Sequence, residues 1–403
     1  MRFGLDGRQG CFQMSRILHT MLKLPVYLDN NATTPVDPAV LETMLPYFTE
    51  HFGNAASRTH SFGWIAEEAV QVAREQVAAL IGADSEEIVF TSGATEAINL
   101  AIKGTCDIRQ GEKHIITCVT EHKAVLDTCK ALEKKGVRVT YLPVDAGGIV
   151  DTGLLEASIT PQTVLISIMF ANNETGVIQP VREIASIAKR HHTWFFSDAT
   201  QAVGKVPVDV EKLGIDMLCL SAHKMYGPKG TGALYIRRKA PRVRITAQMD
   251  GGGHEKGFRS GTLNVPGIAG LGKAAAICRE KMSEESAGIA MLRDLLENGL
   301  SSDSITVNGN VDNRLPHTTN LAFNNVPGSR LLTGLNKTIA VSAGSACTSA
   351  NPAPSHVLQA MGLPDDLIKS SIRFGLGRFT TQEEIEYCIA EVKTILEQLR
   401  GVW

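Results

Sequence analysis

Hydrophobic and polar residues follow two different patterns through the middle of the chain. Seven short apolar runs have the length of strands, among them "EEIVF", "HIITC", "VLISIMF" and "MLCLS". Between them lie stretches such as "ATEAINLAIKG" and "VREIASIAKRH", in which apolar residues recur at the spacing of a helix face. Strands that alternate with amphipathic helices are typical of a parallel sheet covered on both faces. We therefore predict an α/β fold with a mainly parallel seven-stranded sheet, whose ligands bind at the carboxyl ends of the strands.

The pattern changes at "GGGHEKGFRSGT" (251–262), after which two helical stretches flank a few short strands. We interpret this part as a second, smaller α/β domain, since one core rarely serves a chain of this length. The predicted organisation is an N-terminal extension (1–24), a segment that contributes to the small domain (25–50), a large domain (51–262) and a small C-terminal domain (263–403). The first twenty residues carry three arginines and little apolar continuity, so we expect them to be dispensable.

Composition narrows the class of protein. The 403 residues carry a formal net charge of -2, which argues against nucleic acid or a membrane surface as partner, because both require a clustered basic excess. The apolar runs are too short to cross a bilayer. Eight cysteines form no CxxC pair and no dense spacing, so neither a zinc site nor a disulfide framework is indicated. We expect a soluble protein of the reducing cytoplasm.

Two predicted strand ends carry groups that suit an anion and a proton. In "FTSGATEA" (90–97) a strand leads into a helix start, where free backbone N–H groups and the Thr95 hydroxyl would face an anion. In "FFSDATQAV" Asp198 ends a buried strand and Gln201 follows three residues later. The alternative interpretation of this second pattern is a helix capping box with Asp198 as N-cap.

Two further strand ends carry a possible nucleophile and a flat ring. Ser221, His223 and Lys224 leave the strand in "CLSAHKMYGPKGTG" and enter a glycine-rich turn. A lysine is usually a solvated surface charge, but burial at a strand end can lower its pKa and make it an amine nucleophile. His122 in "VTEHKAVL" lies just beyond the strand "HIITC", where a histidine is more often structural than catalytic.

One cofactor accounts for all four strand ends together. A phosphate site, a lysine that captures an aldehyde, an aspartate for a pyridinium nitrogen and a ring to stack on the cofactor are the parts of a pyridoxal 5'-phosphate site. The combination is far more specific than any single member.

The chain resembles the cysteine desulfurases, fold type I pyridoxal-phosphate enzymes of the class V aminotransferase group. The resemblance begins near residue 25 and runs in the family's order through the motifs "YLDNNATTPVDP", "FTSGATEAINLAIKG", "TEHKAVLDTC", "NNETGVIQP", "SDATQAVGK", "SAHKMYGPKGTGALYIR", "GGGHEKGFRSGT", "SAGSACTSANPAPSHVL" and "SSIRFGLGRFT". It implies a homodimer that removes sulfur from L-cysteine and passes it on, for iron-sulfur cluster assembly or other thio-cofactors.

The resemblance also implies a role for each matching residue. Lys224 would bind the cofactor aldehyde and move protons, His122 would stack on the ring, and Asp198 would pair with its nitrogen. Gln201 and Asn173 would lie near the phenolic oxygen, with Asn173 also at the substrate, and Arg373 would grip the substrate carboxylate. The phosphate would be held by Ala94, Thr95, Ser221 and His223, with Thr262 reaching across from a second subunit.

Cys347 lies in "SAGSACTSAN" among small polar residues, whereas a structural cysteine usually sits in apolar packing. The resemblance implies that this thiol takes the substrate sulfur as a persulfide and leaves alanine. The stretch "SACTSANPAPSHVLQAMG" matches the longer, housekeeping and nitrogen-fixation type of loop, although the chain ends at "LEQLRGVW" without the longer tail of many housekeeping members. Selenocysteine lysis, transamination or racemisation on the same fold stays an alternative, as does a non-enzymatic sulfur relay.

Overall fold

The computed structural model describes residues 22–343 and 354–400. Its largest sheet has seven strands in the order β2-β8-β7-β6-β5-β3-β4. The strands are β2 (Ile88–Thr91), β3 (His114–Cys118), β4 (Arg138–Leu142), β5 (Thr163–Ser167), β6 (Trp194–Asp198), β7 (Met217–Ser221) and β8 (Gly232–Ile236). Within this sheet only β8 is antiparallel to its neighbours, β2 and β7. The prediction of a mainly parallel seven-stranded sheet is therefore confirmed.

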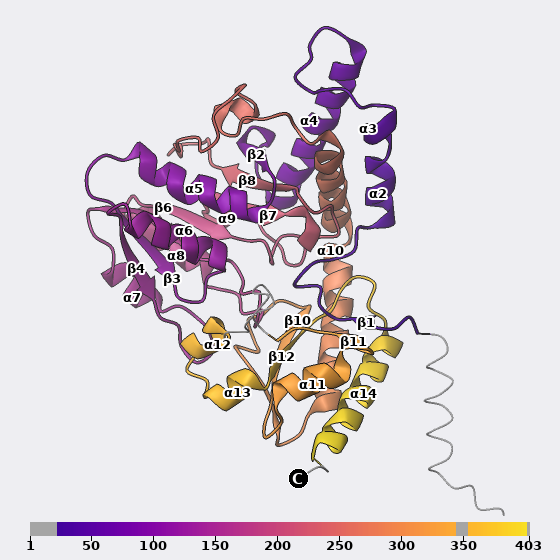
Figure 1. Cartoon of the computed structure of the whole chain (residues 1–403). Coiled ribbons are helices and arrows are strands. Elements are labelled where there is room, and N and C mark those ends of the chain that lie inside the picture. The colour runs from indigo at the N-terminus through magenta and orange to yellow at the C-terminus, as the bar shows by residue number, and fades with distance from the viewer. Residues whose placement is uncertain (1–21, 344–353, 401–403) are drawn as a thin grey trace, which may run out of the picture.

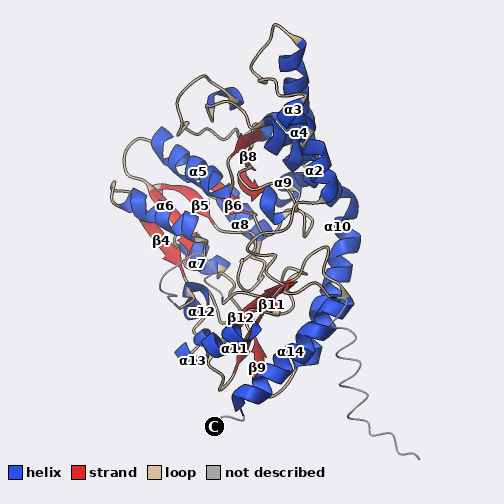
Figure 2. Cartoon of the chain, turned by 45° about the vertical axis from the view of Figure 1, so that its right-hand side comes forward, coloured by secondary structure: helices blue, strands red, loops and turns tan. Residues whose placement is uncertain are grey.

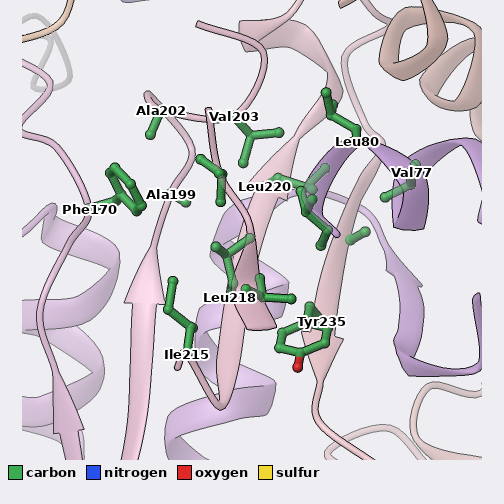
Figure 3. Packing of buried hydrophobic residues seen from close by; sticks show 14 of the residues in the cluster. Val77, Leu80, Phe170, Ala199, Ala202, Val203, Ile215, Leu218, Leu220 and Tyr235 are labelled. Carbon is green, nitrogen blue, oxygen red and sulfur yellow. The ribbon is translucent and has the colours of Figure 1, made fainter. Parts of the chain in front are cut away.

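Side-chain alternation along the strands gives the core of this sheet two layers, one on each face. On β7, Leu218 and Leu220 belong to one buried cluster, and Met217 and Cys219 belong to another. Figure 3 shows Leu218, Leu220 and Tyr235 in the first cluster. Helices α4 (Ser61–Ile81), α8 (Val181–Arg190) and the first half of α10 (Val265–Leu300) cover that face, and α5 (Ala94–Ile108) with α6 (Lys123–Glu133) cover the other. The sheet is thus buried on both sides, as parallel strands require.

A second core lies around a three-stranded antiparallel sheet, in the order β12-β10-β9. It comprises β9 (Ile305–Val307), β10 (Thr318–Phe323), β12 (Ser371–Gly375), α11 (Gly328–Leu335), α14 (Gln382–Arg400) and the second half of α10. Figures 1 and 2 show α10 running along both sheets. Its 36 residues span about 54 Å and contribute to both cores, so the boundary at residue 262 stays a prediction.

The N-terminal part of the described chain lies against both cores. Strand β1 (Val26–Tyr27) pairs in parallel with β11 (Ile339–Ala340), and Asp29 bridges to Gly375. After this, α2 (Pro38–Met44) packs on α10, and α3 (Pro46–Thr49) follows it. Residues 29–37 consequently pass between the two sheets. Among the described residues, no helix combines the length and the apolar character needed to cross a membrane.

Candidate active site

A cavity of about 550 Å³ opens at the carboxyl ends of β3, β5, β6 and β7, which is the edge predicted from the strand pattern. The structure brings most of the predicted site residues to its wall, namely Ala94, Thr95, His122, Asn173, Asp198, Gln201, Ser221, His223, Lys224 and Arg373. Thr262 is exposed and does not line this cavity. Cys347 lies outside the described residues.

Lys224 is placed by a short turn at the end of β7. The chain leaves Ser221 through the 3-10 turn η2 (Ala222–Lys224), which brings the lysine side chain back over the strand ends. Its Nζ donates to the backbone carbonyls of Asn31 at 2.5 Å and Ala32 at 2.6 Å. The amine is therefore held at the cavity wall by the N-terminal segment, a contact that the sequence analysis missed. The run of polar residues in "DNNATT" directly after β1 was the available signal.

Asp198 and Gln201 do not form the capping box considered as an alternative. No helix follows Asp198, and its Oδ1 accepts from the Thr200 N–H at 3.0 Å and from the Cys219 thiol at 3.3 Å. The Gln201 amide donates instead to the Asn31 carbonyl at 3.0 Å, the same oxygen that receives Lys224. The carboxylate at the end of β6 is thus fixed, and Gln201 shares an anchor with Lys224.

The two histidines of the site have defined hydrogen-bonding roles. His122 is the N-cap of α6, and its Nδ1 accepts from the Ala124 N–H at 3.1 Å, so the neutral ring carries its proton on Nε2. The Nδ1 of His223 lies 3.1 Å from the Thr33 hydroxyl. Burial, followed by the charges of Lys224 and Lys229, lowers the pKa of His223 to about 4. His223 is therefore neutral at physiological pH.

The start of α5 is shaped to receive an anion. Its N-cap is Gly93, which has a φ of 152° and offers no side chain to the free N–H groups of the first turn. A Cβ on Gly232 would lie 2.7 Å from the Gly93 Cα, so the loop is packed tightly against β8. Ala94 and Thr95 begin the helix beside the Ser221 hydroxyl, and all three line the cavity. Free N–H groups, hydroxyls and the positive end of the helix dipole all favour a phosphate here.

Arg373 on β12 is a buried guanidinium that is only partly paired. It forms a salt bridge to Asp29 at 2.7 Å and donates from NH1 to the Asn173 carbonyl at 3.0 Å. Its Nε is buried and has no hydrogen-bond partner among the described residues. A fixed planar guanidinium that lines the cavity suits a carboxylate ligand.

Two buried glutamates escaped the sequence analysis. Glu174 lines the cavity, is 3% exposed, and accepts from the Ser355 hydroxyl at 2.5 Å. Burial raises its pKa to about 7, against the opposing effects of the Ser355 hydrogen bond and the Arg373 charge. Burial also raises the pKa of Glu121, whose Oε1 accepts from the Met169 N–H. The motif "NNETG" contains Glu174, but a sequence pattern gives no sign that this carboxyl points inward.

The chain on either side of Cys347 is attached to the cavity wall. Ser342 exchanges backbone hydrogen bonds with Arg373, at 2.7 Å and 3.4 Å. Ser355 is the N-cap of α12 (His356–Ala360) and donates to Glu174, while the His356 Nε2 lies 3.0 Å from the Glu121 carbonyl. The described segments before and after Cys347 are therefore both fixed at the cavity wall.

We expect Gly375→Ala to disturb the site through Asn31, against which Gly375 packs. A Cβ on Gly375 would lie 2.2 Å from the Asn31 Oδ1 and 2.9 Å from its backbone N. Overpacking of this kind costs about 1–3 kcal/mol, and it displaces the carbonyl that holds Lys224 and Gln201. Thermal unfolding should show a lower Tm, and steady-state kinetics a lower kcat/KM. Gly288→Ala is the control, because a Cβ there meets nothing within 4 Å; an equal loss in both variants would contradict the steric argument.

We also expect Glu174 to make stability fall with rising pH. Its pKa is about 7 in the folded protein against an ordinary value of 4.5, so the folded state holds more protons between these values. The free energy of unfolding therefore decreases as pH rises through this window, by about 3 kcal/mol from this one group.

Denaturant unfolding of wild type and Glu174→Gln at about pH 5 and about pH 8 would measure this effect. The variant should lose less stability between the two pH values than the wild type. Burial also raises the pKa of the Asp216 carboxyl to about 6. This group titrates in both proteins, so its effect on stability cancels when the two are compared. Identical pH dependence in the two proteins would remove Glu174 from the account.

Comparisons with known proteins agree with this geometry. The family model described as aminotransferase class-V matches residues 26–388. A protein named cysteine desulfurase IscS from Anaeromyxobacter dehalogenans (strain 2CP-C) is 56% identical over 371 residues, 91% of each chain. One of the same name from Mannheimia succiniciproducens is 55% identical over 385 residues, 94% of this chain and 95% of that one.

Solved structures place the chain in the same group. A NifS-like protein superposes with a TM-score of 0.87 at 41% identity, covering 93% of this chain and all of the other. A structure described as SspA in complex with cysteine gives a TM-score of 0.79 at 39% identity over 88% of this chain. The match extends over nearly the whole described chain, including both sheets and the cavity between them. The chain belongs to the class-V aminotransferase family and, within it, to the cysteine desulfurases.

Proposed function

We propose that this protein is a pyridoxal-phosphate-dependent cysteine desulfurase that transfers the sulfur of L-cysteine to Cys347 and releases L-alanine. The persulfide sulfur then passes to a protein acceptor, such as a scaffold for iron-sulfur clusters. The observation that carries the proposal is the attachment of the chain around Cys347, at Ser342 and Ser355, to the two cavity residues Arg373 and Glu174. A transaminase needs no cysteine in the segment between Ser342 and Ser355.

The residues at the cavity wall fit the cofactor. The uncapped start of α5 with Ser221 suits its phosphate, the fixed carboxylate of Asp198 suits a ring nitrogen that carries a proton, and the Lys224 amine suits its aldehyde. When bound, pyridoxal phosphate supplies that aldehyde and a ring that withdraws electrons from the substrate Cα. The neutral His223 adds no charge of its own at the phosphate.

The chain's own residues divide the remaining work. Arg373 holds the substrate α-carboxylate with its guanidinium, which lines the cavity. Lys224 removes the proton from the substrate Cα and returns protons to the carbon skeleton that leaves as alanine. The Cys347 thiolate attacks the substrate sulfur, so that an S–S bond forms as the Cβ–S bond breaks. L-cysteine and one enzyme thiol thereby become alanine and one enzyme persulfide, with no external oxidant.

The reaction class can be tested by incubating the protein with L-cysteine and a thiol reductant. The proposal requires alanine and sulfide in equal amounts, because each turnover releases one of each. Pyruvate in place of alanine would favour another lyase, and mercaptopyruvate without sulfide would favour a transaminase. Rapid turnover of L-selenocysteine, with L-cysteine barely used, would favour selenocysteine lysis.

The compartment is part of the proposal. The six cysteines described by the structure are free and buried, namely Cys106, Cys118, Cys129, Cys219, Cys278 and Cys388. Unpaired thiols of this kind support a reducing cytoplasm.

We also predict a homodimer that buries the exposed apolar side chains near α2, α3 and α4. Phe48, Phe52 and Trp64 are all more than half exposed there, a density of large apolar groups that usually marks an interface. Thr262 is exposed away from its own cavity, which supports a role at the neighbouring subunit's phosphate.

Phe48→Glu combined with Phe52→Glu should yield monomers by analytical ultracentrifugation and weaken retention of the cofactor. Val311→Glu is the matched control, since Val311 is also a half-exposed apolar residue but lies in the loop after β9. A wild-type protein that sediments as a fully active monomer would contradict the prediction.

A further inference from the structure

Tyr226 occupies a strained backbone position two residues after Lys224. Its φ is 65°, in the left-handed region that a bulky residue rarely adopts because the backbone is strained there. The surrounding contacts hold it there. Its N–H donates to the Thr34 hydroxyl at 2.8 Å, and its carbonyl accepts from the Asp37 N–H at 2.9 Å. Thr34 in turn donates from its N–H to the His223 carbonyl at 2.9 Å, so the turn carrying Lys224 is fixed on both sides of the lysine.

The Tyr226 ring is buried beneath two cations. The Lys205 Nζ lies 4.4 Å and the Arg378 Cζ 4.2 Å from the ring centroid. The phenolic oxygen also accepts hydrogen bonds from the Lys205 Nζ at 3.3 Å and from the backbone N–H of Arg378 at 2.5 Å. Cation–π contacts are strongest where the cation and the ring are shielded from water. The Tyr226 side chain is thus held both by the cations that contact its ring and by the hydrogen bonds to its phenolic oxygen.

Arg378 ties this arrangement to the second core. It follows β12, five residues after Arg373, and its charge is balanced by Asp37 at 2.7 Å and by Glu285 of α10 at 2.7 Å. Tyr226 therefore contacts the chain that continues from the strand of the carboxylate-binding arginine, while its own backbone continues the turn of the nucleophilic lysine.

We propose that Tyr226 is a positioning residue that sets Lys224 relative to Arg373. The inference rests on the proposed function, because it assigns the proton transfer to Lys224 and the carboxylate to Arg373. A lysine that removes the Cα proton must face that carbon while Arg373 holds the carboxylate one bond away. Misplacement by about 1 Å typically costs about 10²-fold in rate. We attribute the strained backbone at Tyr226 to this positioning of Lys224 relative to Arg373.

Two variants separate the contributions of the ring and the oxygen. Tyr226→Phe keeps the ring under both cations and loses only the acceptor oxygen, so we expect kcat/KM to fall about 5-fold. Tyr226→Leu loses both, and we expect kcat/KM to fall by about 10²-fold, through a lower kcat and a higher KM together. Tyr235→Phe is the control, since Tyr235 is an equally buried tyrosine that packs in the sheet core (Figure 3).

The measurement is activity per bound cofactor, with a second reading that does not depend on turnover. Borohydride reduction followed by peptide mass analysis gives the fraction of Lys224 linked to cofactor, which should fall in Tyr226→Leu and be rescued in Tyr226→Phe. Tyr226→Leu with wild-type kcat, KM and linked fraction would overturn the proposal. A lower Tm with wild-type activity per bound cofactor would also overturn it, since that is a purely structural role.

Each remaining outcome also has a meaning. If Tyr226→Leu does not fold, Tyr226→Phe decides, and wild-type kcat/KM in that variant overturns the proposal. Failure of the proposed function would look different, because the wild-type protein itself would then release no alanine from L-cysteine.

Discussion

Cys347→Ser should lose sulfur transfer while still binding L-cysteine. A hydroxyl keeps the size and polarity of the thiol but is a far poorer nucleophile, of which essentially none is ionised at neutral pH. We expect alanine and sulfide release to fall by more than about 10³-fold. The visible spectrum of the bound cofactor should nevertheless still change on addition of L-cysteine, because Arg373 and Lys224 are intact.

The control is Cys11→Ser, which changes a thiol in the N-terminal extension that carries no role in the account. Wild-type rates are expected there. Near-normal alanine and sulfide release from Cys347→Ser would remove this cysteine from the mechanism and favour a lyase or transaminase reaction on the same fold.

Lys224→Ala should fail at a different step. The variant lacks the amine that the Asn31 and Ala32 carbonyls hold at the cavity wall, so no covalent link to the cofactor aldehyde can form. Loss of the group that moves the Cα proton costs about 10²–10⁴-fold on its own. Borohydride reduction should therefore fix no cofactor on the protein, and alanine release should be lost.

Lys189→Ala provides the comparison, since Lys189 is an exposed lysine of α8 that does not line the cavity. It should retain both the covalent link and activity. Cofactor fixed by borohydride on Lys224→Ala would show that another amine performs this role.

The sequence predicts the sheet and the strand-end residues well because both follow from local patterns. Apolar runs of strand length specify buried strands, and the carboxyl ends of parallel strands must meet at one edge, which brings Asp198, Ser221 and His122 together. The direction of β8 could not be predicted, since a fully buried apolar run reads the same for parallel and antiparallel pairing.

The missed features depend on contacts distant in sequence. The Asn31 carbonyl accepts hydrogen bonds from Lys224 and Gln201, which both lie more than 150 residues later in the chain. The buried carboxyl of Glu174 accepts from Ser355, 181 positions later. Neither contact leaves a periodic signal. For Gln201 the local pattern is misleading, because its spacing from Asp198 fits a capping box. Its amide donates instead to the Asn31 carbonyl of the N-terminal segment. Tertiary hydrogen bonding decides such cases.

The central claim is that Cys347 receives the sulfur, and one measurement tests it directly. The protein loaded with pyridoxal phosphate is mixed with L-cysteine in the absence of reductant, quenched after a single turnover, alkylated and digested for peptide mass analysis. We expect one extra sulfur atom on the peptide containing Cys347 and one alanine released per active site. Alanine formed with the extra sulfur on another cysteine, or on none, would contradict it.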